Sequence, residues 1–292
     1  DDSLFQMRVL TVVLIAIVGA TAAKLPHKPD DSVIAAAQAF IFNQTGNAVI
    51  GGTKANTGQF PFTVAICKFG SSKCEFKAAG SLISDSYVLT TSTGLHYDND
   101  SSKFRVDAGS NYCGGAVSRF VKQIIVHPDV NSNKNSHLND IVLIQLDSPF
   151  TLNDNVKPIA LPKSDSDFNK VQNYATFTGW GHSSNSWFAS MEDYLRSSSF
   201  YIADQSTCLS RYSHFDKDAS VCAGGPPGPG TTCNYDNGGP LFDTRNGNYY
   251  LFGLSAMNGD DYANSGCKYA TIFTRVSYYC SWIEKNSGVK CV

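Results

Sequence analysis

The sequence predicts an all-β fold, built as a sandwich or a barrel, because short apolar runs recur along the chain with turn residues between them. Gly, Asn, Asp and Ser separate these runs, and the chain holds 24 Gly, 14 Tyr and 18 Phe, a composition that favours short strands over long helices. The runs that we expect to form strands include residues 62–66, 87–90, 141–144, 174–178 and 249–254.

Composition excludes several classes of protein. Of the 292 residues, 42% are hydrophobic and 16% are charged, which supplies a sizeable core and too little charge for a disordered chain. The formal charge is −2, so a nucleic-acid partner is not expected. The sequence shows no constellation of metal ligands, and the polar stretch 97–103 is interpreted as a solvated surface, so we expect no metal and no cofactor.

The N-terminal part indicates export. Met7 and Arg8 precede an apolar run at 9–20, and Ala20 and Ala22 give the small-x-small form of a signal-peptidase site. We therefore expect residues 1–6 to be upstream sequence, 7–22 a signal peptide, and the mature protein to be secreted and extracellular. Nine cysteines fit an oxidising compartment, and their odd number leaves at least one unpaired within a monomer. The apolar run is too short to span a bilayer, so no membrane partner is expected.

The remainder divides into a leader and one patterned region. Residues 23–48 show no core-forming pattern and are interpreted as a pro-segment. The strand-like texture begins at residue 49. Near the end, Tyr278, Trp282 and Ile283 predict one closing helix over about residues 277–290.

A series of short motifs then identifies a family. In order along the chain they are VIGG at 49–52, QFPF at 59–62, GSLIS at 80–84, YVLT at 87–90, NDIVLI at 139–144, TGWG at 178–181 and CNYDNGGPL at 233–241. From residue 49 to the end the chain resembles the trypsin-like serine proteases of the chymotrypsin fold. The resemblance implies two six-stranded antiparallel β-barrels, at about 60–155 and 173–275, with the catalytic groups in the cleft between them.

The resemblance also exposes substitutions at the catalytic positions. Thr93 stands where the family has its catalytic His, Asn237 stands where it has the nucleophilic Ser, and Asp140 keeps the place of the Asp. A Thr hydroxyl is a poor general base near neutral pH, and an Asn amide is a poor nucleophile. Tyr235 replaces the Gly whose amide lines the oxyanion hole, so we expect that position to be blocked. These substitutions predict a pseudoprotease, not an enzyme.

The substrate pocket differs from the family as well. Thr231 stands at the position of the Asp that attracts basic substrates, and Thr271 replaces a Gly of the pocket wall. The substrate-binding edge aligns with Ala256, Met257 and Asn258. A β-branched Thr271 is expected to narrow the pocket. Two interpretations stay open: drift after the loss of catalysis, or a cleft remodelled to bind another molecule.

The activation machinery is kept in part. The resemblance implies that Asp236 pairs with the α-amino group of Val49 after cleavage at the Ala48–Val49 bond. Asn47 precedes this bond, with no Arg or Lys for trypsin-like activation. A comparable junction occurs in the group 3 mite allergen trypsins, and together with the altered triad the chain looks like the inactivated serine protease paralogues of the scabies mite.

Cysteine spacing and sequons give further expectations. The resemblance implies disulfides Cys208–Cys222 and Cys233–Cys267, and Cys67 with Cys74 is interpreted as the staple of one hairpin. The partners of Cys113, Cys280 and Cys291 stay open; an intact closing helix would hold Cys280 and Cys291 about 16 Å apart, too far to bridge. The sequons at Asn43 and Asn99 are candidate glycosylation sites.

The function expected from these observations is protein binding by a secreted protease homologue. The resemblance to the scabies mite group implies antagonism of host defence, notably of complement. One alternative is a competitor or regulator of active paralogous proteases, and another is a residual hydrolase with non-standard chemistry. A monomer is expected, with a disulfide-linked dimer as the alternative.

Overall fold

A computed structural model describes most of the chain beyond residue 51. The chain divides into two compact units, 1–46 and 47–292, and every described residue belongs to the second. The predictions for the signal peptide, the pro-segment, Ala48, Val49, Asn43 and Asn258 therefore lie outside the described residues. The described ranges are 52–69, 74–130, 137–182, 191–212, 215–228, 230–257, 267 and 269–292.

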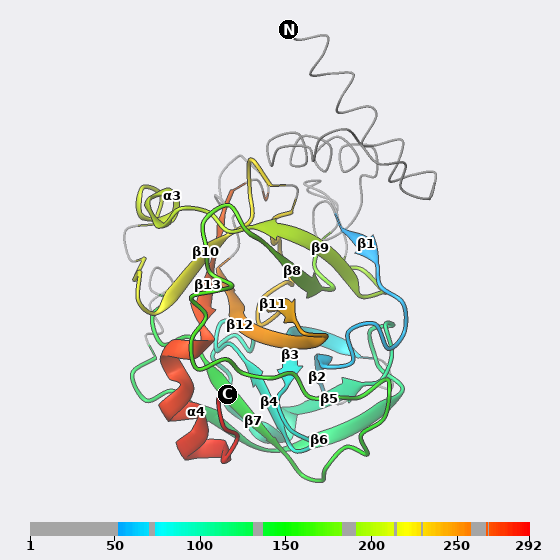
Figure 1. The fold of residues 1–292 in the computed structure, drawn as a ribbon. Helices are drawn as coiled ribbons and strands as arrows, with labels where there is room; N and C mark the ends of the chain where they lie inside the picture. Colours follow the sequence, from blue (N-terminus) through cyan, green and yellow to red (C-terminus); the bar gives the residue numbers. More distant parts are fainter. Residues whose placement is uncertain are drawn as a thin grey trace, which may run out of the picture. The chain divides into compact units, whose positions relative to one another are not determined.

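Six antiparallel strands form a closed barrel in the order β2-β3-β4-β7-β6-β5 (Figure 1). The predicted runs at 62–66, 87–90 and 141–144 supply β2, β4 and β7, and a 3₁₀ helix, η1 (Ser101–Lys103), leads into β5. Alternate β2 side chains, Val64 and Ile66, fill the barrel interior. The strands are β2 (Thr63–Lys68), β3 (Glu75–Leu82), β4 (Tyr87–Thr90), β5 (Phe104–Ala108), β6 (Val117–Val126) and β7 (Val142–Leu146).

The second sheet has seven strands in the order β1-β9-β8-β11-β12-β13-β10. Its strands are β1 (Thr53–Lys54), β8 (Tyr174–Gly179), β9 (Arg196–Tyr201), β10 (Ser220–Ala223), β11 (Pro240–Arg245), β12 (Asn248–Met257) and β13 (Thr271–Arg275).

The expected chymotrypsin-like fold is confirmed, and the second of its two barrels takes the form of a half-barrel of seven strands. A single bridge between Ile202 and Ala223 joins the end of β9 to β10. The ladder stops there because Asp204 caps helix α3 (Gln205–Leu209), and the chain leaves the sheet two residues after the bridge.

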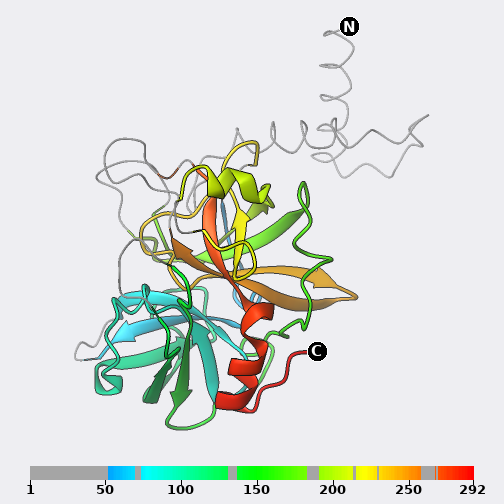
Figure 2. The same cartoon turned by 90° about the vertical axis from the view of Figure 1, so that its left-hand side faces the viewer.

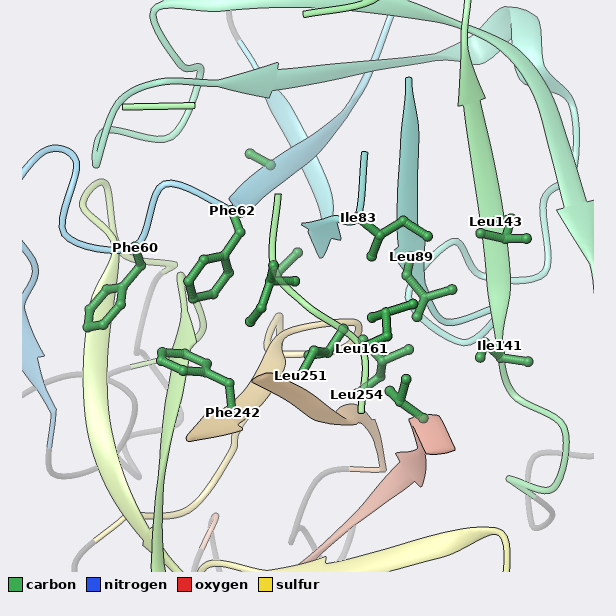
Figure 3. Packing of buried hydrophobic residues seen from close by; sticks show 14 of the residues in the cluster. Phe60, Phe62, Ile83, Leu89, Ile141, Leu143, Leu161, Phe242, Leu251 and Leu254 are labelled. Atoms are coloured by element: carbon green, nitrogen blue, oxygen red, sulfur yellow. The ribbon is translucent and has the colours of Figure 1, made fainter. Parts of the chain in front are cut away.

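A shared core joins the two sheets, as the side chains in Figure 3 show. Phe62 and Leu143 come from the closed barrel, and Phe242 and Leu254 come from the second sheet. The rings of Phe62 and Phe242 meet edge to face with centroids 4.8 Å apart. This packing fixes the loop after β4 against the segment that precedes β11, and those two segments carry the candidate site.

The closing helix is shorter than predicted. A 3₁₀ turn, η2 (Val276–Tyr279), leads into α4 (Cys280–Ser287), which ends where Gly288 takes a left-handed conformation with φ 74°. The chain then turns back, so the Cα atoms of Cys280 and Cys291 lie 6.0 Å apart and the two residues form a disulfide. The intact helix to residue 290, and the separation inferred from it, were wrong. Helix α4 lies beside β7 of the closed barrel (Figure 2).

Four disulfides brace this unit. Besides Cys280–Cys291, they join Cys67 to Cys74, Cys208 to Cys222 and Cys233 to Cys267. All nine cysteines lie in the described ranges, and Cys113 is the free one. Among the described helices, none has the length and apolar character to cross a membrane.

Candidate functional site

The loop after β4 folds Thr93 into a tight pair of turns. Tyr97 N donates to the Ser92 carbonyl at 2.8 Å, and His96 N donates to the Thr93 carbonyl at 3.0 Å. His96 and Tyr97 both have positive φ, 53° and 59°, so the chain doubles back sharply. The doubling brings the Tyr97 hydroxyl to 3.3 Å from the Thr93 hydroxyl. Sequence reasoning missed Tyr97 as a neighbour of Thr93 because residue spacing alone does not reveal the left-handed backbone.

Asp140 binds the backbone of this loop. The Thr93 amide donates to Asp140 Oδ1 at 3.0 Å, while Oδ2 makes no hydrogen bond with the described residues. The side chain is fully buried, and burial raises the pKa of Asp140 to about 6, an effect that hydrogen bonds from Thr93 oppose. Thr274 of β13 donates its hydroxyl to the Asp140 carbonyl at 2.8 Å. Asp140 is therefore a buried, weakly acidic carboxyl anchored to the second sheet.

Asn237 meets the Thr93 loop from the segment before β11. Its carbonyl accepts from the Ala79 amide of β3 at 3.1 Å. A Cβ on Gly94 would lie only 3.4 Å from the same carbonyl, which shows how closely the two segments approach. The side-chain Oδ1 of Asn237 is buried and makes no hydrogen bond with the described residues. The structure thus brings Thr93, Asp140 and Asn237 together at one place.

Tyr235 projects from the same segment with a left-handed backbone, φ 71°. Its ring packs on the imidazole of His182 with centroids 5.3 Å apart, and 46% of the residue is exposed. Burial lowers the pKa of His182 and so favours the neutral imidazole. His182 directly follows the TGWG motif, which was the available signal for it. A blocked oxyanion position stays a prediction.

Asp236 is held by backbone groups. Its Oδ1 accepts from the Gly181 amide at 3.0 Å, and its Oδ2 accepts from the Cys233 amide at 2.9 Å. A Cβ on Gly179 or Gly181 would overlap this carboxylate, so both positions need Gly. Burial raises the pKa of Asp236 to about 7, against the two N–H donors. Its expected partner, the Val49 amino group, lies outside the described residues.

The substrate-pocket positions are closely packed. Thr231 donates its hydroxyl to the Tyr269 carbonyl at 2.6 Å, and the hydroxyls of Thr271 and Thr232 lie 2.7 Å apart. These three Thr residues and Ala256 are all buried. The hydroxyls on this wall therefore bond to protein groups. Sequence reasoning missed Thr232, whose side chain pairs with that of Thr271.

Met257, the remaining described position of the predicted substrate-binding edge, is placed by its backbone. It is the last residue of β12 and pairs with Ile272 of β13.

A cavity of about 270 Å³ opens beside the Thr93 loop. Apolar side chains and polar groups of the loop both line it, and Asn99 is exposed. Burial raises the pKa of Tyr97, so its phenol stays protonated and able to donate. The lining residues are Ser92, Leu95, Tyr97, Asp98, Asn99, Val126, Val130 and Val142.

The described residues contain one group with metal-ligand proximity, formed by Cys67, Cys74 and Asp107. Two of its members are joined in a disulfide, so they offer no thiolate to a metal. The chemistry available around Thr93 and Asn237 consists of a buried carboxyl, a phenol, a hydroxyl and an amide.

Comparisons with known proteins identify the family to which the chain is similar. The model of the family described as trypsin matches residues 49–283. Chymotrypsin-like elastase family member 1 of Felis catus is 32% identical over 252 residues, covering 83% of this chain and 91% of the relative. The protein of the same name from Macaca fascicularis is 32% identical, with 84% and 91% covered, and that from Canis lupus familiaris is 31% identical, with 82% and 93% covered.

These comparisons contradict the prediction that the chain is not an enzyme. The relatives are named as elastases, and the similarity extends over most of the chain. The prediction was wrong because it inferred the activity of the whole chain from a few positions. The residue types at Thr93 and Asn237 describe those two side chains only. The chain belongs to the trypsin family of serine proteases.

Proposed function

We propose that this trypsin-family protein is secreted and acts by binding other proteins at the surface formed by Thr93, Asn237 and the adjacent cavity, in antagonism of host defence such as complement. The observation that carries the choice of surface is the cavity beside Thr93, whose mixed apolar and polar lining suits a side chain of a protein ligand.

Secretion is supported by the four disulfides, which persist in oxidising compartments. The signal-peptide pattern at 7–22 points the same way. The choice of complement comes from the resemblance to the scabies mite paralogues and the group 3 mite allergens, and the choice of surface comes from the geometry.

A test compares the full-length protein with two matched variants in assays of complement activation by each of its three routes. Val130→Asp places a charge in the cavity, whereas Val171→Asp places the same charge at an exposed loop position, 47% exposed, that does not line it. We expect the native protein and Val171→Asp to inhibit equally and Val130→Asp to be about tenfold weaker, the effect of about 1.4 kcal/mol of lost affinity. Equal inhibition by both variants, or none by the native protein, would reject this surface or this role.

A second candidate function is hydrolysis of peptide bonds beside small residues. The elastase names of the relatives favour it, and the buried Thr271 on the pocket wall is consistent with a narrow pocket. Release of p-nitroaniline from a short alanine-rich peptide anilide measures it. Activity that co-purifies with the full-length protein and disappears in Asn237→Ala would support hydrolysis at this site. The third candidate, competition with active paralogues for their substrates, is disfavoured by the close packing of the same pocket wall.

A further inference from the structure

Three cysteine sulfurs lie close together in the closed barrel. The disulfide Cys67–Cys74 joins β2 to the residue just before β3. The free thiol of Cys113 lies 3.4 Å from Cys74 Sγ. This distance is within the range of reacting atoms held for attack, about 3–3.5 Å. Cys113 is only 7% exposed, so the disulfide is its immediate reaction partner.

Asp107 completes the group from the neighbouring strand β5. Its Oδ2 lies 3.2 Å from Cys67 Sγ, while its Oδ1 accepts from the Ser118 hydroxyl at 2.6 Å. A disulfide sulfur has no proton to donate, so in the present pairing Cys67 gives Asp107 nothing. A Cys67 thiol at the same position would have its acceptor already in place.

We propose that Cys113 exchanges with the Cys67–Cys74 disulfide, so that the protein has two disulfide isomers. Cys113 Sγ attacks Cys74 Sγ, the Cys74–Cys113 bond forms and the Cys67–Cys74 bond breaks. The electron pair leaves on Cys67 Sγ, which takes up one proton in place of the one that Cys113 lost. One thiol and one disulfide are present before and after, so the step needs no external oxidant or reductant.

The exchange moves a covalent tie from within a hairpin to between two regions. Cys67 and Cys74 are 7 residues apart, whereas Cys113 lies in the turn between β5 and β6. The Cys113 amide donates to the Asp193 carbonyl at 2.7 Å, near the start of β9. The new isomer therefore ties the β2–β3 hairpin to a segment that contacts the second sheet.

The turn between β5 and β6 also contacts the segment that holds Asp236. The indole of Trp180 donates to the Asn111 carbonyl at 3.3 Å, and the next residue, Gly181, donates to Asp236. Exchange at Cys113 thus acts on a turn that supports this part of the site, which makes the pair of isomers a conformational device.

Burial and the neighbouring charges control the rate of the exchange through the pKa of Cys113. Burial raises the pKa of Cys113 to about 12, with Asp107 and Asp193 adding to the rise and Arg105 opposing it. The thiolate is the attacking species. At pH values below that pKa, the thiolate fraction rises about tenfold for each unit of increase in pH. Exchange is therefore slow at neutral pH and faster at high pH.

The test follows the free thiol in the full-length oxidised protein. Samples held at about pH 7.5 and about pH 9.5 are quenched in acid, unfolded and alkylated, and the labelled cysteine is located by peptide mass spectrometry. We expect the label to move from Cys113 to Cys67, about 100-fold faster at the higher pH. A label that stays on Cys113 at both pH values overturns the proposal.

Two variants separate this exchange from general scrambling. In Cys67→Ser we expect a Cys74–Cys113 disulfide, and two free thiols in the folded, oxidised variant would contradict the exchange. Cys113→Ser is the matched control, in which the Cys67–Cys74 bond must persist under the same incubation. Cys208–Cys222 serves as the internal reference, since its retention shows that disulfides elsewhere have not exchanged. Should Cys67→Ser fail to fold, the migration of the label in the native protein decides.

Discussion

Asp140 and Asp236 are both buried carboxyls at the candidate site, and they differ in what surrounds them. Both oxygens of Asp236 accept backbone N–H groups, and two glycines leave room for the carboxylate. Asp140 accepts the Thr93 N–H at Oδ1, and its Oδ2 makes no hydrogen bond with the described residues. Backbone N–H groups therefore hold the Asp236 carboxylate at both oxygens, whereas Oδ2 of Asp140 accepts no hydrogen bond from the described residues. Side-chain changes are accordingly expected to act mainly on the Asp140 side.

The largest expected effect comes from two side-chain substitutions on the Asp140 side. In the double variant T93H/N237S, an imidazole stands next to Asp140 and a hydroxyl replaces the Asn237 amide, which supplies a base and a nucleophile. We expect the double variant to hydrolyse an alanine-rich peptide anilide at least about 10³-fold faster than either single variant. The single variants are the controls, because neither supplies both groups. A native rate within tenfold of the double variant would mean that the existing side chains already perform the chemistry.

The next effect falls on the Asp236 side. Gly181→Ala forces a Cβ into the space of the buried carboxylate, and we expect it to cost about 3 kcal/mol of unfolding free energy in urea titrations. Gly247→Ala is the matched control: its φ is 77° but no atom lies within 4 Å of the added Cβ, so only the backbone strain of about 1 kcal/mol applies. Equal losses at the two positions would show that the groups around Asp236 accommodate the added Cβ without a free-energy cost.

The two carboxyls together predict how stability depends on pH. Their folded-state pKa values, about 6 for Asp140 and about 7 for Asp236, lie above the ordinary value of 3.8, so the folded state binds these protons more tightly than the unfolded state. The stabilisation is complete below about pH 4 and is lost as the pH rises through 6 and 7.

Thermal denaturation of the uncut chain should accordingly show a Tm that falls between about pH 5 and pH 8, which corresponds to a loss of stability on the order of 4 kcal/mol. Asp236→Asn removes one of the two titrations and is expected to flatten the profile. A Tm that stays constant or rises across this window contradicts the raised pKa values.

The smallest effect concerns the pocket wall. Thr271→Val leaves the Thr232 hydroxyl without its partner at 2.7 Å, and we expect a loss of about 1 kcal/mol. The double variant T232V/T271V removes both hydroxyls and is expected to recover part of that loss, which a double-mutant cycle in urea measures. Strictly additive losses would mean that the two hydroxyls act independently.

Sequence reasoning captured what repeats along the chain and what stands in the motifs. The apolar runs became strands, and the TGWG and CNYDNGGPL motifs meet where Gly181 donates to Asp236. It failed where the backbone turns sharply. Gly288 ends α4 early and lets Cys291 reach Cys280, and the left-handed Tyr97 and Tyr235 bring their rings to Thr93 and His182.

The proximity of Cys113 to Cys74 was equally invisible in the sequence. The two residues come from different turns of the closed barrel and are 39 positions apart. A spacing rule identifies pairs within one hairpin, such as Cys67 and Cys74, but only the closure of the barrel brings a third sulfur alongside them.

The proposal that this chain binds a protein at the Asp140 side is tested most directly by hydrogen–deuterium exchange of the full-length protein, with and without a purified complement component that it inhibits. Protection on binding is predicted at residues 91–99 and 126–130, which border the cavity, with no change in the control loop around Val171. Protection confined to segments away from the cavity, or none at saturation, would contradict it.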